Sequence, residues 1–126
     1  FSMSAPTFPP HPHAGFSAVT YMLPTSPGTF LNRDSRGTQE LIPPGALHWT
    51  EAAAGMMHEE TPWAGGLRCD GLQIFVNLPS NHKLAEPRVM HLDPYDAPVA
   101  SAKDAQLRLL AGTAVGMRSP VQPRTE

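Results

Sequence analysis

His11-Pro12-His13 and His58-Glu59-Glu60 are two triplets in which a metal-binding residue type recurs at every second position. In an extended strand, residues i and i+2 point to the same face. Two such strands can therefore surround one metal ion with three imidazoles, from His11, His13 and His58, and one carboxylate, from Glu60. Glu59 is expected to face the opposite side of its strand. The two triplets predict a mononuclear metal site within a β structure.

The proposed ligand set restricts the metal. Neutral imidazole suits Fe, Ni, Cu and Zn, and a carboxylate adds a hard ligand that suits Fe(II) or Mn(II). Three histidines and one glutamate leave one or two positions open on a five- or six-coordinate ion, where a substrate or dioxygen can bind. The alternative is that His11 and His13 are surface-loop histidines held by neighbouring prolines, because short His-x-His triplets are common by chance.

The overall composition limits the class of protein. The chain has 126 residues, which fits one domain of ordinary size, and a formal charge of −2. Its basic residues are scattered, so no direct nucleic-acid partner is expected. No apolar run is long enough to cross a bilayer, so no membrane partner is expected either. The single cysteine, Cys69, excludes an internal disulfide framework and indicates a reducing, cytoplasmic location. We expect Cys69 to be a buried structural thiol.

Short apolar segments alternate with turn signals along the chain, which contains fifteen prolines and ten glycines. Strands are expected over residues 16–23, 29–32, 40–42, 46–50, 56–60, 67–77, 88–92 and 105–111. The first two are expected to form a hairpin around the turn at 24–28. A helical turn is expected at 51–55, and Gly71 is expected to mark a bulge. Seven or eight short strands at close spacing indicate an all-β barrel or sandwich.

Three other histidines lack a paired partner in the sequence. His82 lies in a polar segment and is expected to be solvated. His91 is expected to be an ordinary strand residue. His48 lies on the opposite face of its strand from Trp49 and is a candidate for lining a pocket.

Several longer motifs occur in a characteristic order. They are Pro10–Phe16 (PHPHAGF), Val19–Tyr21, Arg33–Ser35, Pro44-Gly45, His58–Glu60, Gly71–Pro79 (GLQIFVNLP) and Glu86–Arg88. In order and spacing they resemble the pirin family of the cupin superfamily over nearly the whole chain. The resemblance implies a cupin double-stranded β-helix, a jelly-roll barrel with the metal inside, and the N-terminal half of a bicupin. It places the metal ligands at His11, His13, His58 and Glu60, with Fe(II) as the expected metal and Ni, Cu, Mn or Zn as alternatives.

The resemblance also implies a division of the chain. Residues 1–98 correspond to the N-terminal cupin domain, without its first strands, and residues 99–126 to a connector and the opening strand of a second cupin domain. If that second barrel is absent, Leu107, Leu109, Leu110 and Val115 are expected to expose an apolar surface. The chain would then form a homo-oligomer or pair with the missing barrel.

Three departures from the family pattern leave the substrate preference open. Ala14 stands where many pirins have Arg, which removes a basic group from the expected pocket mouth. Ser17 stands where Glu is common, which removes an acidic neighbour. Residues 24–28 differ from the usual acidic hairpin turn.

The resemblance implies two classes of function. One is a quercetin 2,3-dioxygenase-like enzyme, which cleaves a flavonol with dioxygen and uses Glu60 as general base. Gln73, Phe75, Trp49 and His48 would then line the pocket for a small aromatic substrate. The other is a non-enzymatic iron-binding module that docks onto transcription or metabolic proteins.

Overall fold

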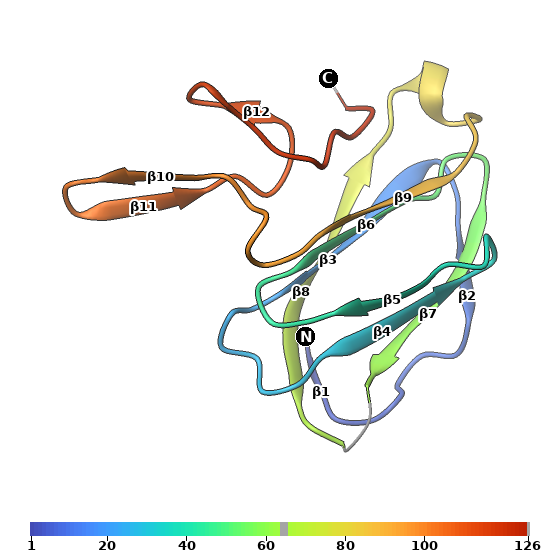
Figure 1. Cartoon of the computed structure of the whole chain (residues 1–126). Helices are drawn as coiled ribbons and strands as arrows, with labels where there is room; N and C mark the ends of the chain where they lie inside the picture. Colours follow the sequence, from blue (N-terminus) through green and yellow to red (C-terminus); the bar gives the residue numbers. More distant parts are fainter. Residues whose placement is uncertain (64–65, 126) are drawn as a thin grey trace.

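The computed structural model describes residues 1–63 and 66–125 and consists mainly of antiparallel strands in two facing sheets (Figure 1). The five-stranded sheet has the order β1 (Ser2–Met3), β8 (Cys69–Asn77), β3 (Phe16–Met22), β6 (Leu47–Glu51) and β9 (Arg88–Leu92). The four-stranded sheet has the order β2 (His11–His13), β7 (Met56–Pro62), β4 (Phe30–Asp34) and β5 (Gln39–Ile42). Two hairpins follow, β10 (Val99–Ala102) with β11 (Ala105–Arg108), and β12 (Thr113–Ala114) with β13 (Met117–Arg118).

The all-β prediction is confirmed, and the one helical element in the described residues is a 3-10 turn, η1 (Ser80–His82). The predicted hairpin is wrong. Strand β3 pairs with β6 and β8, whereas β4 pairs with β5 and β7, so the turn at 24–28 carries the chain from one sheet to the other. No described helix has the length and apolar character that a membrane crossing requires.

Two local predictions are also wrong. Residues 51–55 form no helical turn, because Glu51 ends β6 and Ala53 has a left-handed φ of 44°. Gly71 marks no bulge, since the pairing of β3 with β8 runs unbroken to Met22 and Gly71. A Cβ at Gly71 would lie 2.5 Å from the ring of Phe1, so close packing explains the glycine.

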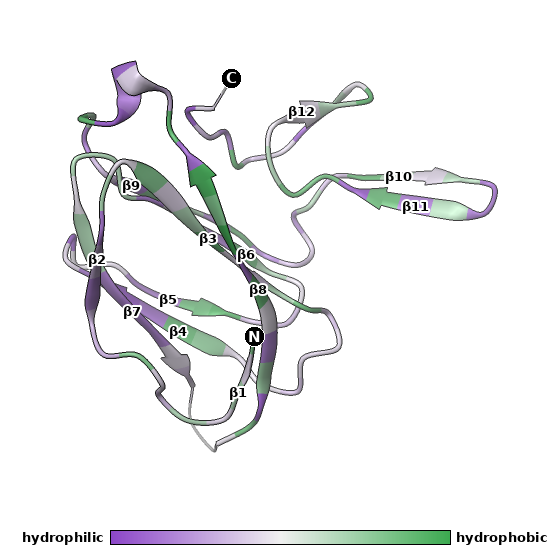
Figure 2. Cartoon of the chain, turned by 180° about the vertical axis from the view of Figure 1, so that it is seen from behind, coloured by the Kyte–Doolittle hydropathy of each residue, from purple (hydrophilic) through white to green (hydrophobic). Residues whose placement is uncertain are grey.

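The two faces of the five-stranded sheet have different roles. On the inner face, Met22 and Cys69 pack with Phe30 and Ile42 of the opposite sheet, and Cys69 is the buried, free thiol that was expected. Alternation along each strand produces this division. Figure 2 shows the hydrophobic stretches of β8 and β5 on their strands.

The outer face of the same sheet is covered in part by the C-terminal segment. Its buried cluster consists of Val19, Leu47, Trp49, Leu92, Ala97 and Val121. Leu109 is buried and Leu110 packs against this cluster, whereas Leu107 and Val115 stay 45% and 72% exposed. Two of the four residues expected to form an apolar surface, Leu109 and Leu110, are therefore packed within the fold. The predicted self-association stays a prediction.

A buried ionic network attaches this segment to β6. Glu51 is fully buried and lies directly opposite Ser17 in the neighbouring strand. Its carboxylate accepts hydrogen bonds from Arg88 at 3.0 and 3.1 Å and from the backbone of Arg124 at 3.0 Å. Burial raises the pKa of Glu51, but the hydrogen bonds and charges of the two arginines outweigh it, and the net pKa is lowered.

Glu51→Gln should lower the free energy of unfolding at pH 7 by about 2 kcal/mol, because it weakens the charged hydrogen bonds that the buried carboxylate accepts from Arg88, whose side chain is itself 35% exposed. The folded-state pKa of Glu51 lies below its ordinary value of 4.5, so its contribution is complete above that pH. The difference between the two proteins should shrink as the pH falls below 4.5. Urea unfolding at pH 7 and in the acid range measures it.

Glu86→Gln is the matched control, because its ion pair with Arg36 lies at the surface and contributes less than about 1 kcal/mol. Equal unfolding midpoints for Glu51→Gln and Glu86→Gln would contradict a stabilising role for the buried network.

Candidate metal centre

Three imidazoles converge where β2 pairs with β7. His11 lies directly opposite His58 in this antiparallel pair, and His13 follows two residues later on the same face. One nitrogen from each ring lies within 4.8 Å of those of the other two. Strand β2 is an edge strand, where Pro12 is tolerated because its missing N–H breaks no inner ladder. The pairing register therefore assembles a group that could hold a metal ion.

Hydrogen bonds to the remaining ring nitrogens orient two of these imidazoles. His58 donates from Nδ1 to the side-chain oxygen of Asn32 at 3.3 Å. His11 donates from Nδ1 to the carbonyl of Pro9 at 2.9 Å. Each bond favours the tautomer whose Nε2 carries a free lone pair, as metal-ligating histidines require.

The electrostatics of the group also fit a cation. The Nε2 atoms of His13 and His58 lie 3.0 Å apart. Burial, followed by the charges of His13 and His11, lowers the pKa of His58 to about 4. Burial and His11 likewise lower the pKa of His13. At pH 7 these rings are neutral, which is the form that binds a metal.

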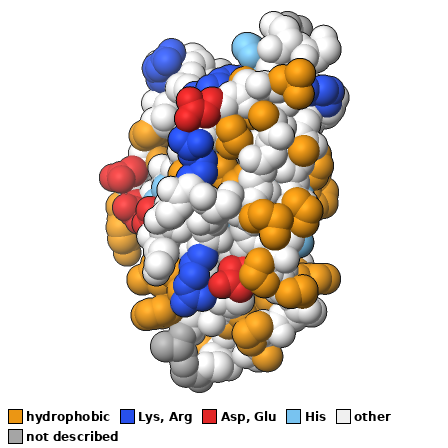
Figure 3. Space-filling model, turned by 90° about the vertical axis from the view of Figure 1, so that its right-hand side faces the viewer, with side chains coloured by type: hydrophobic (Ala, Val, Ile, Leu, Met, Phe, Trp, Pro, Cys, Tyr) orange, Lys and Arg blue, Asp and Glu red, His pale blue; other side chains and the backbone are white. Residues whose placement is uncertain are grey.

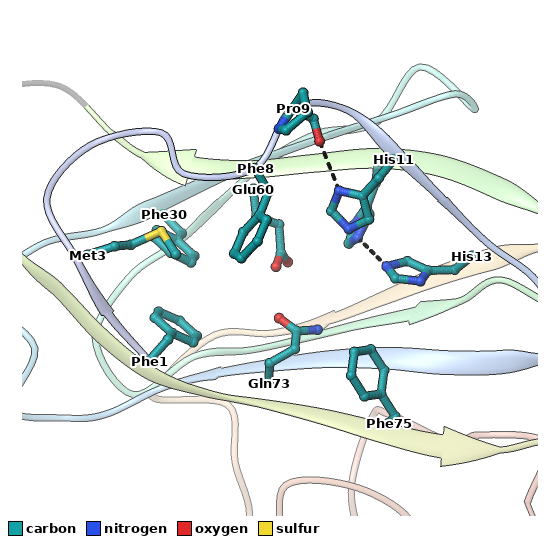
Figure 4. Close-up of a pocket in the computed structure, with 11 residues that line it drawn as sticks. Phe1, Met3, Phe8, Pro9, His11, His13, Phe30, Glu60, Gln73 and Phe75 are labelled. Carbon is teal, nitrogen blue, oxygen red and sulfur yellow. Dashed lines mark hydrogen bonds between the residues drawn. The ribbon is translucent and has the colours of Figure 1, made fainter.

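Glu60 is on the same face of β7 as His58 but has a different partner. Both of its oxygens lie within 2.7 Å of the Thr20 hydroxyl, which also lies 3.0 Å from the side-chain oxygen of Gln73. The carboxylate points toward Gln73 rather than the imidazoles (Figure 4), and it lies outside the three-histidine group. Burial raises the pKa of Glu60 to about 7, and the Thr20 bond opposes that rise.

The Thr20 hydroxyl has a single proton, which limits the hydrogen bonds that it can form with Glu60 and Gln73. A hydroxyl donates only once, so it cannot serve Glu60 and the Gln73 oxygen together. A protonated Glu60 can donate to Thr20, which then donates to Gln73. The arrangement therefore accommodates Glu60 in either protonation state, as its near-neutral pKa suggests.

The histidines and Glu60 open into a cavity of about 470 Å³. Its walls are Phe1, Met3, Phe8, Pro9, His11, His13, Phe30, His58, Glu60, Gln73 and Phe75. In Figure 4 the imidazoles lie at one end, and Phe1, Met3 and Phe30 lie at the other. Glu60 and Gln73 lie between these two ends, so the cavity has an apolar end and a polar centre.

The structure places the four expected pocket residues in different positions. Gln73 and Phe75 line the cavity. Trp49 lies on the outer face of the five-stranded sheet, packed in the cluster under the C-terminal segment. His48 faces inward, but β6 is separated from β8 by β3, and His48 lies beside His91 instead. Neither Trp49 nor His48 is among the residues that line this cavity.

Sequence reasoning missed most of the apolar wall. Phe30 and Phe1 stack with ring centroids 4.9 Å apart, and Phe8 and Met3 complete that end. Alternation along β4 places Phe30 on the same face as Asn32. The contact of Asn32 with His58 shows that this face points toward the site. No local pattern marked Phe8.

Comparison with known proteins identifies related chains. The family model described as Pirin matches residues 2–76. Pirin-1 of Arabidopsis thaliana is 39% identical over 125 residues, covering 99% of this chain and 42% of that protein. A solved Geobacillus kaustophilus protein is 34% identical with a TM-score of 0.88, covering 97% of this chain and 47% of that one. Quercetin 2,3-dioxygenase from Acinetobacter baumannii is 27% identical with a TM-score of 0.79, covering 96% and 45% respectively. The chain thus spans less than half the length of each.

Asn32→Leu should weaken metal binding about 10- to 100-fold, because it removes the acceptor that orients His58. The affinity for Ni²⁺ can be measured by competition with a chelator. Gln73→Leu is the matched control, since Gln73 also lines the cavity but has its polar contact with Thr20. An unchanged affinity in Asn32→Leu would show that the Asn32 contact does not orient the ligand.

Proposed function

Because the chain belongs to the pirin family and its facing sheets form the N-terminal cupin barrel of that family, we propose that it is a metal-dependent dioxygenase that cleaves a flavonol. His11, His13 and His58 would hold the metal, with Fe(II) as the proposed ion, and Glu60 would be a weaker fourth ligand that can leave the ion to act as the base. The observation that carries the proposal is the three-histidine group at one end of an aromatic-walled cavity. The likeness to the quercetin 2,3-dioxygenase of Acinetobacter baumannii supports the choice of substrate class.

The cavity suits a flat, weakly polar molecule. Its volume of about 470 Å³ lies within the range of small-molecule sites. The stacked pair of Phe1 and Phe30 offers an apolar wall at one end. Phe75 lies beside the three-histidine group, with its ring centroid 5.9 Å from that of His13. Aromatic rings pack well against such walls, whereas a strongly charged substrate would lose its hydration there without compensation.

A metal at the three histidines would supply Lewis acidity that lowers the pKa of a substrate hydroxyl. Glu60 accepts the hydroxyl proton on a carboxylate oxygen, and its pKa of about 7 is matched to that task. Thr20 holds the carboxylate in position, and Gln73 offers an amide to a polar group on the substrate.

The regulatory alternative would be favoured by a charged patch near the metal group. Close to His58, however, Arg33 is paired with Glu59 at 3.1 Å. On the face seen in Figure 3, acidic and basic side chains are interspersed among hydrophobic ones. These features support the enzymatic proposal over docking through a charged surface.

Metal-loaded protein should consume quercetin and dioxygen, and Glu60→Gln should reduce kcat about 10²- to 10⁴-fold, because the general base is lost. Its metal content should fall far less than its turnover. Flavonol absorbance and an oxygen electrode measure the rate, and elemental analysis measures the metal. His58→Ala, which should lose the metal itself, separates the two effects. Absence of flavonol loss at any iron, nickel or copper loading would sink the enzymatic proposal.

Thr20→Val should reduce kcat about tenfold, the factor that corresponds to one lost hydrogen bond of about 1.4 kcal/mol. Thr20→Ser keeps the hydroxyl and should restore most of the rate. Stopped-flow assays of both variants at matched metal content provide the comparison. If the Ser and Val variants were equally slow, packing of the Thr20 methyl group would explain the effect instead.

A further inference from the structure

A second pair of histidines lies inside the fold, outside the cavity described above. His48 of β6 and His91 of β9 are directly opposite each other in the antiparallel ladder. Each alternates with residues that pack on the outer face, so both rings point toward the interior between the sheets. Their centroids are 5.7 Å apart, and the planes are inclined at 51°.

Neither ring has a hydrogen-bond partner among the described residues. All four ring nitrogens are buried, and His48 as a whole is only 1% exposed. Buried polar atoms are nearly always hydrogen-bonded or bound to an ion, because leaving them unpaired costs about 1–3 kcal/mol each. In contrast, His58 and His11 each use a ring nitrogen in a hydrogen bond.

Oxygen ligands lie around the pair. Against the lowering by burial, the charge of Asp34 on the facing sheet raises the pKa of both His48 and His58, and its Oδ2 is buried without a partner among the described residues. Its other oxygen is already used by the backbone of Arg36 and Thr38. At the outer end, Asp93 Oδ1 lies 3.5 Å from Nε2 of His91. Two imidazoles and a nearby carboxylate are thus present without mutual hydrogen bonds.

We propose that His48 and His91 form a second binding site for a divalent transition metal, separate from the three-histidine group. Metal–imidazole bonds are about 2.0–2.1 Å long, so two rings on one tetrahedral ion have centroids roughly 5 Å apart. The observed 5.7 Å requires only a small adjustment. A carboxylate of Asp34 or Asp93, or solvent, would complete the ligand set. Neutral imidazoles with one carboxylate suit Zn²⁺, Ni²⁺ or Cu²⁺.

The site would also have a structural effect. Strand β9 is the edge of the five-stranded sheet and, within the described residues, pairs with β6 alone. An ion shared by His48 and His91 would join these two strands through side chains as well as backbone. The side chain of His91 keeps 17% exposure, which provides a route from solvent.

Zn²⁺ binding to the metal-stripped full chain tests the proposal. Equilibrium dialysis with elemental analysis should find two equivalents in the wild type and one in His48→Gln and in His91→Gln. His58→Ala should also retain one equivalent, held by the second pair. His82→Gln, which alters a histidine on η1 away from both sites, should retain two.

A single equivalent in the wild type would overturn the proposal, as would a second equivalent that survives His48→Gln. An anomalous difference map of zinc-loaded wild-type crystals provides a measurement that depends on no variant. It should show a peak between His48 and His91, and a peak at the three-histidine group alone would also overturn it. Failure of flavonol turnover leaves these outcomes unaffected, so the two proposals are tested separately.

Discussion

The pairing register of β2 with β7 is the constraint on which the candidate metal centre depends. Because His11 lies opposite His58, the three imidazoles come from adjacent positions on one face of one sheet. A slip of one residue would turn the histidines of one strand to the other face and scatter the group. Strand β7 is held in register by a second pairing, with β4, which brings Asn32 opposite Glu60 and within reach of His58. The strand that supplies the ligands is therefore fixed on both sides.

Strand β3 connects this centre with the rest of the molecule. Its inward residue Thr20 holds Glu60, while its outward residue Val19 packs in the cluster beneath the C-terminal segment. At the end of the same strand, Ser17 faces Glu51, whose carboxylate binds Arg88 and Arg124. Alternation thus lets one strand both position Glu60 and anchor the segment that covers the sheet.

The local part of the site could be predicted from the sequence, because the i, i+2 rule acts within a few residues. It places His11 with His13 and His58 with Glu60, and it separates Gln73 and Phe75 from the outer residues of β8. The order of strands in a sheet has no such local signal. Trp49 and His48 were expected in the pocket, but β3 separates β6 from β8, and Trp49 packs on the outer face of the sheet. The contact of Thr20 with Glu60 spans 40 residues and depends on how the two sheets face each other.

The order and facing of the strands also determine what the serine at position 17 means for the site. Ser17 lies on the outer face of β3, so an acidic side chain there would have no contact with the three-histidine group. The neighbouring strand supplies Glu51 at the directly opposite position, and buried acids are tolerated only when they are paired. Pairing with Arg88 and Arg124 meets that requirement for Glu51. The requirement applies equally to His48 and His91, whose buried nitrogens have no protein partner in the described residues.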